Sequence, residues 1–76
     1  MNNPRRKQLD AIIAKIQELS NDLECIMDEE QEYLENIPEN LQSSERYEKA
    51  EAACDSLQCA LDNLEECVEN IETAKE

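Results

Sequence analysis

The side chains of this chain that could do chemistry are its cysteines, serines and carboxylates, and their spacing limits what they can do. There is no histidine, and the four cysteines are Cys25, Cys54, Cys59 and Cys67. No two of them have the C-x-x-C spacing of zinc sites, so the sequence predicts no metal centre. The Glu-x-x-His pairs of carboxylate-bridged di-metal bundles are absent too.

Catalysis by a serine or cysteine nucleophile would need a neighbouring base, and the sequence offers no plausible one. We therefore expect no enzymatic activity, no catalytic residue and no cofactor. Cys54 and Cys67 fall at positions that we expect to face the core, where cysteine behaves as a small apolar residue. Cys25 and Cys59 are expected on the outside, with no nearby cation to lower the thiol pKa.

The helices that position these residues are predicted from two series of residues at alternating intervals of three and four. All residues of both series are apolar except Glu30. The first series is Leu9, Ile12, Ile16, Leu19, Leu23, Ile26, Glu30, Tyr33 and Ile37; the second is Tyr47, Ala50, Cys54, Leu57, Leu61, Leu64, Val68 and Ile71. This spacing is typical of helices packed along a narrow seam. With Leu9 and Tyr47 as heptad position a, each series occupies positions a and d.

A first helix is predicted over residues 4–36. Asn3 followed by Pro4 is a typical helix start, with a capping residue before a proline at the first helical position. Pro38 disfavours the helical conformation for the residue before it, so residues 37–43 are predicted to form a connector.

A second helix is predicted over residues 44–74, with Ser43 or Ser44 as its N-cap. Each helix would be roughly 50 Å long at about 1.5 Å per residue. Similar lengths and a short connector predict a single all-α domain over residues 1–76, an antiparallel two-helix hairpin of coiled-coil type.

A third apolar column on each helix predicts self-association. In the first helix it lies at position e, with Ser20 as a gap, and in the second it consists of small residues at position g: Ala53, Ala60, Cys67 and Ala74. Two helices alone rarely form a sufficient core at this size, so we expect a homodimer or higher oligomer, in which two copies would form a four-helix bundle. The residues expected to carry self-association are Ile13, Met27, Leu34, Leu57, Leu61, Leu64 and Val68.

Acidic residues dominate the polar surface. Twenty acidic residues against seven basic ones give a net charge of −13, which argues against direct binding of nucleic acid or anionic membranes. Positions b and e of the second helix form a candidate acidic surface of Glu48, Glu51, Asp55, Asp62, Glu65, Glu69 and Glu72. This surface either keeps a small bundle soluble or mimics a phosphate backbone and so inhibits a basic nucleic-acid-binding protein.

Glu30 is the one charged residue in the a and d positions. A single polar residue there can set the register or the oligomeric state at a cost in stability. The alternative is a loose seam in which Glu30 reaches solvent or pairs with Lys49.

The start of the chain is basic, but no unbroken apolar run follows it, so we expect no signal peptide. No stretch is apolar enough to span a bilayer. We expect a cytoplasmic protein with reduced cysteines.

The segment from Asp28 to Ala53, DEEQEYLENIPENLQSSERYEKAEAA, contains the pattern YxxNxPExLQ, and Asp55 to Glu66 reads DSLQCALDNLEE. These patterns resemble uncharacterised small acidic helical-hairpin proteins of Firmicutes and their phages or prophages. The resemblance implies a helical hairpin and an origin in a mobile element, and it transfers no functional residue. We expect a non-enzymatic interaction or accessory protein whose partners are itself and a basic protein.

Overall fold

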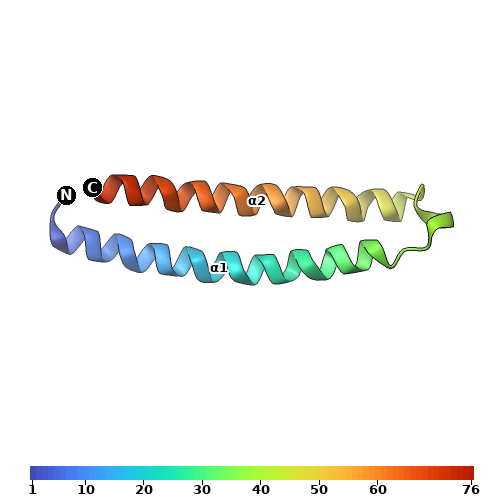
Figure 1. Cartoon of the computed structure of the whole chain (residues 1–76), viewed down its shortest axis with the longest axis horizontal. Helices are drawn as coiled ribbons and strands as arrows, with labels where there is room; N and C mark the ends of the chain where they lie inside the picture. The colour runs from blue at the N-terminus through green and yellow to red at the C-terminus, as the bar shows by residue number, and fades with distance from the viewer.

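The computed structural model describes all residues, 1–76, as two long helices lying side by side (Figure 1). Helix α1 spans Asn3–Glu35 and helix α2 spans Glu45–Lys75, with a short 3-10 helix, η1, at Glu39–Leu41. The two chain ends lie together at one end of a molecule 59 Å long, and the connector lies at the other. The predicted all-α antiparallel hairpin is confirmed, and each long helix begins and ends one residue from its predicted bounds.

Side-chain caps fix where both helices begin. The side chain of Asn2 accepts a hydrogen bond of 2.9 Å from the Arg5 N–H, so the cap lies one residue before the predicted Asn3. Ser44 caps α2, where its hydroxyl accepts from the Tyr47 N–H at 3.3 Å. Each cap satisfies an N–H that has no partner within the helix.

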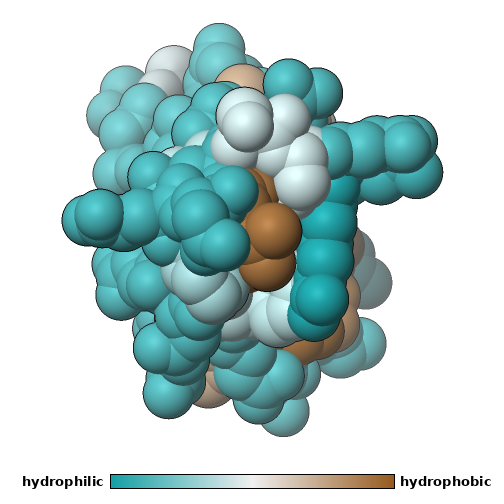
Figure 2. Space-filling view, turned by 90° about the vertical axis from the view of Figure 1, so that its right-hand side faces the viewer, coloured by the Kyte–Doolittle hydropathy of each residue, from teal (hydrophilic) through white to brown (hydrophobic).

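The connector closes one end of the hairpin around a small core. Ile37 is buried there with Leu34, Ala50 and Cys54, and Tyr47 packs against this cluster. The hydrophobic surface at this end is confined to a small central area and one lower edge among hydrophilic side chains (Figure 2).

Contacts at both ends fix the register of the helices. At the chain ends, the Arg6 Nε donates a 2.8 Å hydrogen bond to the Lys75 carbonyl. The Lys75 ammonium pairs with the carboxylate of Asp10 on the other helix, and its hydrogen bonds to Asp10 and Glu72 raise the pKa of Lys75. At the connector end, the Arg46 guanidinium lies 5.1 Å from the centre of the Tyr33 ring.

The seam between the helices differs from the predicted seam on α1. Position a packs inward as expected, but it is joined by position e: Ile13 and Leu34 are 6% and 8% exposed, and Ser20 and Met27 are half-buried. Position d, which was predicted to lie in the seam, is exposed. Positions d and e lie about 60° and 40° to opposite sides of a, so only one of them can join a on the side facing α2.

The seam of α2 is the predicted one. Every residue at its a and d positions from Tyr47 to Ile71 is buried or half-buried. Leu57, Leu61, Leu64 and Val68 are half-buried there.

The core that results is thin. Only five of the 76 residues are buried, and none has less than 2% of its surface exposed. The chain exposes 5769 Å², whereas a compact monomer of 8.8 kDa would expose about 4,800 Å². The hairpin therefore leaves about 1,000 Å² more surface in water than a compact fold of its mass.

Candidate functional site

An apolar column runs along the outside of α1. Ile12, Leu19, Ile26 and Tyr33, all at position d, are 45%, 62%, 56% and 38% exposed. They are spaced by seven residues, so they recur about every 10 Å along one line of the helix. Four large side chains in one line are unlike the scattered single apolar residues of an ordinary surface.

The small residues at position g of α2 border the same side of the hairpin. Arg46, which shares position g with them, donates a hydrogen bond to the hydroxyl of Tyr33 at position d of α1. Further along, Leu9 of α1 lines a shallow groove with Cys67 and Ala74 of α2. We call this side the apolar face; it consists of Ile12, Leu19, Ile26, Tyr33, Ala53, Ala60, Cys67 and Ala74.

The polar residues that border the apolar face on α2 carry almost no negative charge. Position c there holds Lys49, Ser56, Asn63 and Asn70. The acidic residues of α2 are instead concentrated at positions b and e, on the opposite side of the helix. The hairpin thus has one broad face that is apolar and one that is acidic.

The residues predicted to carry self-association lie in the seam within one chain. Ile13 and Leu34 are buried there, and Met27 is half-buried in the same seam. The exposed column on α1 is position d, and the part of the predicted residues in self-association stays a prediction. The sequence did contain a signal for the apolar face. It is the presence of a column of large residues at position d of α1 together with a column of small residues at position g of α2.

All seven residues of the candidate acidic surface are exposed. Glu72 is the only one in an ion pair, at 3.2 Å from the Lys75 ammonium. The remaining acidic side chains have no cation within ion-pairing distance, so their charges are balanced only by solvent and counter-ions. Asp62 accepts a 3.1 Å hydrogen bond from the amide of Gln58, its neighbour on the same helix.

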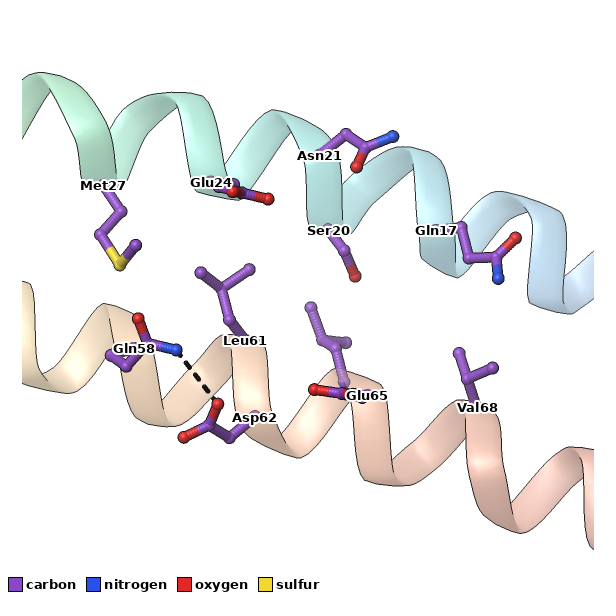
Figure 3. A pocket seen from close by; sticks show the side chains of 11 residues that line it. Gln17, Ser20, Asn21, Glu24, Met27, Gln58, Leu61, Asp62, Glu65 and Val68 are labelled. Carbon is purple, nitrogen blue, oxygen red and sulfur yellow. Dashed lines mark hydrogen bonds between the residues drawn. The ribbon is translucent and has the colours of Figure 1, made fainter.

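A groove of about 350 Å³ opens on the acidic side of the seam, where Ser20 interrupts the apolar residues of α1 (Figure 3). Leu61 and Val68 of α2 and Met27 of α1 point into the space between the helices. Glu24, Asp62 and Glu65 lie along its rim. The small serine side chain leaves this part of the seam open to water.

Glu30 lies half-buried in the seam and forms no ion pair. Lys49, its expected partner, instead pairs with Glu45 on its own helix at 3.0 Å. Burial raises the pKa of the Cys54 thiol, and the negative charges of Glu30 and Asp55 raise it further. Glu30 is thus a polar interruption beside the small core at the connector end.

The cysteines occupy three kinds of position. Cys54 is buried, as predicted, and Cys25 and Cys59 are exposed, as predicted. Cys67 is exposed, contrary to the prediction that it packs in the core, because position g lies on the flank of the seam. All four thiols are free, and no three cysteine or carboxylate side chains lie close enough together to hold a metal ion.

Neither helix is apolar over a length sufficient to cross a membrane. Comparison of the chain with protein-family models, curated proteins and solved structures found no match. The two contrasting faces of the hairpin are the features that bear on its function.

Proposed function

We propose that this chain is a non-enzymatic interaction protein that self-associates through its apolar face. The observation that carries the proposal is the exposure of the large d residues of α1, which the fold of one chain leaves uncovered. A hairpin with five buried residues has little core of its own, and domains of this size usually need added contacts. A second copy is the simplest source of those contacts.

The broad side of the hairpin is large enough to hold a stable interface. It measures 59 by 16 Å, a footprint of about 900 Å², compared with roughly 800 Å² per partner in stable interfaces.

The test is to place a charge on the apolar face. Leu19→Lys puts an ammonium at the most exposed residue of the column, where a second copy would bury it. Leu41→Lys is a matched control, since Leu41 is also an exposed leucine but lies in the connector. We expect Leu19→Lys to be a monomer by light scattering at concentrations where the wild type and Leu41→Lys are oligomers. Equal molar masses for both variants would contradict the proposal.

A second candidate function is inhibition of a basic nucleic-acid-binding protein by charge mimicry. It is favoured by the exposure of the acidic surface and its position opposite the apolar face, where self-association would leave it free. Asp55, Asp62 and Glu69 recur about every 10 Å along α2. Glu65 reduces this spacing to about 5 Å between Asp62 and Glu69, whereas the corresponding residue between Asp55 and Asp62 is the uncharged Gln58. The closer spacing is comparable to that of a phosphate row.

The mimicry is tested by reversing Asp55, Asp62 and Glu69 together to lysine. We expect the wild type to capture a nucleic-acid-binding protein that added DNA displaces, and the triple variant to lose it. Reversal of Glu18, Glu32 and Glu35 on α1 gives the same net charge on a different surface and should retain capture. Full capture by the Asp55, Asp62 and Glu69 variant would reject mimicry by this surface.

A further inference from the structure

We propose that the two hairpins pack face to face about a two-fold axis parallel to the helices, so that α1 of each copy lies over α2 of the other. This arrangement depends on the proposed self-association and specifies how the partner is oriented. Two face-to-face arrangements are compatible with two-fold symmetry. The alternative axis crosses the helices, places α1 over α1 and α2 over α2, and puts the connectors at opposite ends.

The sizes of the side chains distinguish the two arrangements. The apolar face carries large residues on α1 and mostly alanine on α2. With α1 over the partner's α2, each contact joins a large column to a small one, and all helices are equally spaced. With like helices paired, the isoleucine and leucine columns would hold the two α1 helices apart and leave a gap between the two α2 helices. Unfilled gaps lose dispersion contacts and destabilise a packed interface.

The heights of the residues along the hairpin fit the first arrangement. Within one chain, Arg6 bonds to Lys75 and Arg46 to Tyr33, so residues at equal height have numbers that sum to about 80. With both connectors at the same end, the same relation holds between one copy's α1 and the other copy's α2. Ile26 then lies at the height of residue 54 of the second copy, next to Ala53. A large side chain level with a small one on the facing helix lets the two helices approach closely.

The next positions extend the same pattern along the face. Leu19 lies at the height of residue 61 of the second copy, next to Ala60, and Ile12 lies at the height of residue 68, next to Cys67. The pairing of a large residue with a small one therefore continues over three successive heptads.

The charges at the edge of the face are compatible with the same arrangement. Position g of α1 carries Lys15, Asp22 and Glu29, all exposed. Over the partner's α2, the two carboxylates meet position c, which holds Lys49, Ser56 and Asn63 and no acidic residue. In the alternative arrangement, with the d columns aligned, Asp22 would lie beside Asp22 of the second copy but Glu29 would lie beside Lys15, so the sizes of the side chains, and not the charges, distinguish the two arrangements.

The distance between the two connectors tests the arrangement. Cys25 and Cys59 would be changed to serine and Cys67 to alanine, whereas the buried Cys54 stays. A spin label would then be attached to Gln42→Cys in the connector, and pulsed dipolar spectroscopy would measure the distance between labels. We expect about 20–30 Å, two or three helix spacings. The same label at Lys7→Cys, at the other end, should give a similarly short distance.

Each outcome has one meaning. Circular dichroism first establishes that the labelled proteins remain helical. If the triple replacement unfolds the chain, the cysteines are replaced one at a time instead, and Cys67 is blocked before the spin label is attached. Short distances at both ends support the arrangement. A dimer whose connector labels lie about 50 Å apart, close to the 59 Å length of the hairpin, would overturn the arrangement but leave self-association intact. A helical monomer with no label-to-label distance would overturn both.

Discussion

Glu30 is the residue of the seam whose charge is least well compensated. It is half-buried beside the core at the connector end and forms no ion pair. A carboxylate in such a position loses part of its hydration without a compensating partner. The preceding and following residues at position a are Leu23 and Ile37, so this part of the seam accommodates large apolar side chains.

Replacing Glu30 with leucine should stabilise the hairpin by about 1–2 kcal/mol, because partial apolar burial replaces a poorly solvated charge. The measurement is the free energy of unfolding by urea titration. Glu32→Leu serves as the control, since it removes the same charge from an exposed position and should change stability little. A loss of stability in Glu30→Leu would show that Glu30 makes a contact that the protein requires.

Cys54 gives a pH dependence whose sign follows from its raised pKa. The thiol of the folded chain holds its proton to higher pH than the ordinary value of 9.0, because burial and nearby carboxylates disfavour the thiolate. Stability from this group is complete below the pKa of the unfolded thiol and is lost as the pH rises through the pKa of the folded one. Cys54→Ala should therefore lose less stability than the wild type between about pH 8 and about pH 10.

Urea titrations of both proteins across this pH range measure the difference. Lys75, whose pKa is also raised, is present in both proteins, so its contribution cancels in the comparison. Parallel losses of stability would mean that Cys54 is not shielded from solvent. Alkylation gives an independent check, because Cys54 should react more slowly than Cys25 or Cys59.

The helices illustrate what could be predicted from the sequence and what could not. The ends of α1 and α2 could be predicted because proline, asparagine and serine act on the few residues around them. The seam of α2 could be predicted because its large residues occupy only positions a and d. In α1, the steps from Leu9 to Ile12 to Ile16 and from Leu9 to Ile13 to Ile16 both alternate three and four.

Periodicity alone therefore could not decide which of the two α1 columns faces α2. The choice depends on how both helices rotate to bury their largest residues together, which is a property of the packed pair. The exposure of the d column of the apolar face could not be predicted for this reason, although its alanine column could be identified from the sequence.

The assignment of columns on α1 is tested by paired truncations. Leu34→Ala removes a buried side chain and should cost about 2–4 kcal/mol, within the range for buried leucines. Leu19→Ala, measured at a concentration low enough for the monomer, should cost less than about 1 kcal/mol because Leu19 is 62% exposed. If both substitutions lower the free energy of unfolding equally in the urea titrations, position d would have to lie in the seam.

The close approach of a helix to the alanine column is tested by enlarging one alanine. Ala60→Met should weaken self-association at least tenfold, because a longer side chain fills the space that a neighbouring helix would occupy. Ala52→Met is the control; the same substitution lies on the outer edge of α2, away from the apolar face. Sedimentation velocity over a dilution series gives both dissociation constants, and an unchanged constant for Ala60→Met would place the interface elsewhere.

The charge of the whole molecule should oppose assembly at low salt. A net charge of −13 is spread over a narrow hairpin, and three ion pairs offset little of it. Raising the salt concentration from low to moderate should therefore raise the melting temperature, because screening weakens repulsion among the carboxylates.

The triple reversal of Asp55, Asp62 and Glu69 changes the net charge from −13 to −7, since each reversal adds two charges. Its melting temperature should depend less steeply on salt than that of the wild type. A melting temperature of the wild type that falls as salt is added would mean that attractive ion pairs dominate instead.

The central claim is that one hairpin is incomplete and that a second copy covers the apolar face. Sedimentation equilibrium of the wild type at low micromolar concentration, in moderate salt, tests it most directly. We expect a molar mass of twice the 8.8 kDa of one chain, with helical content that falls as dilution separates the copies. A mass of 8.8 kDa with full helical content that persists on dilution would contradict the claim.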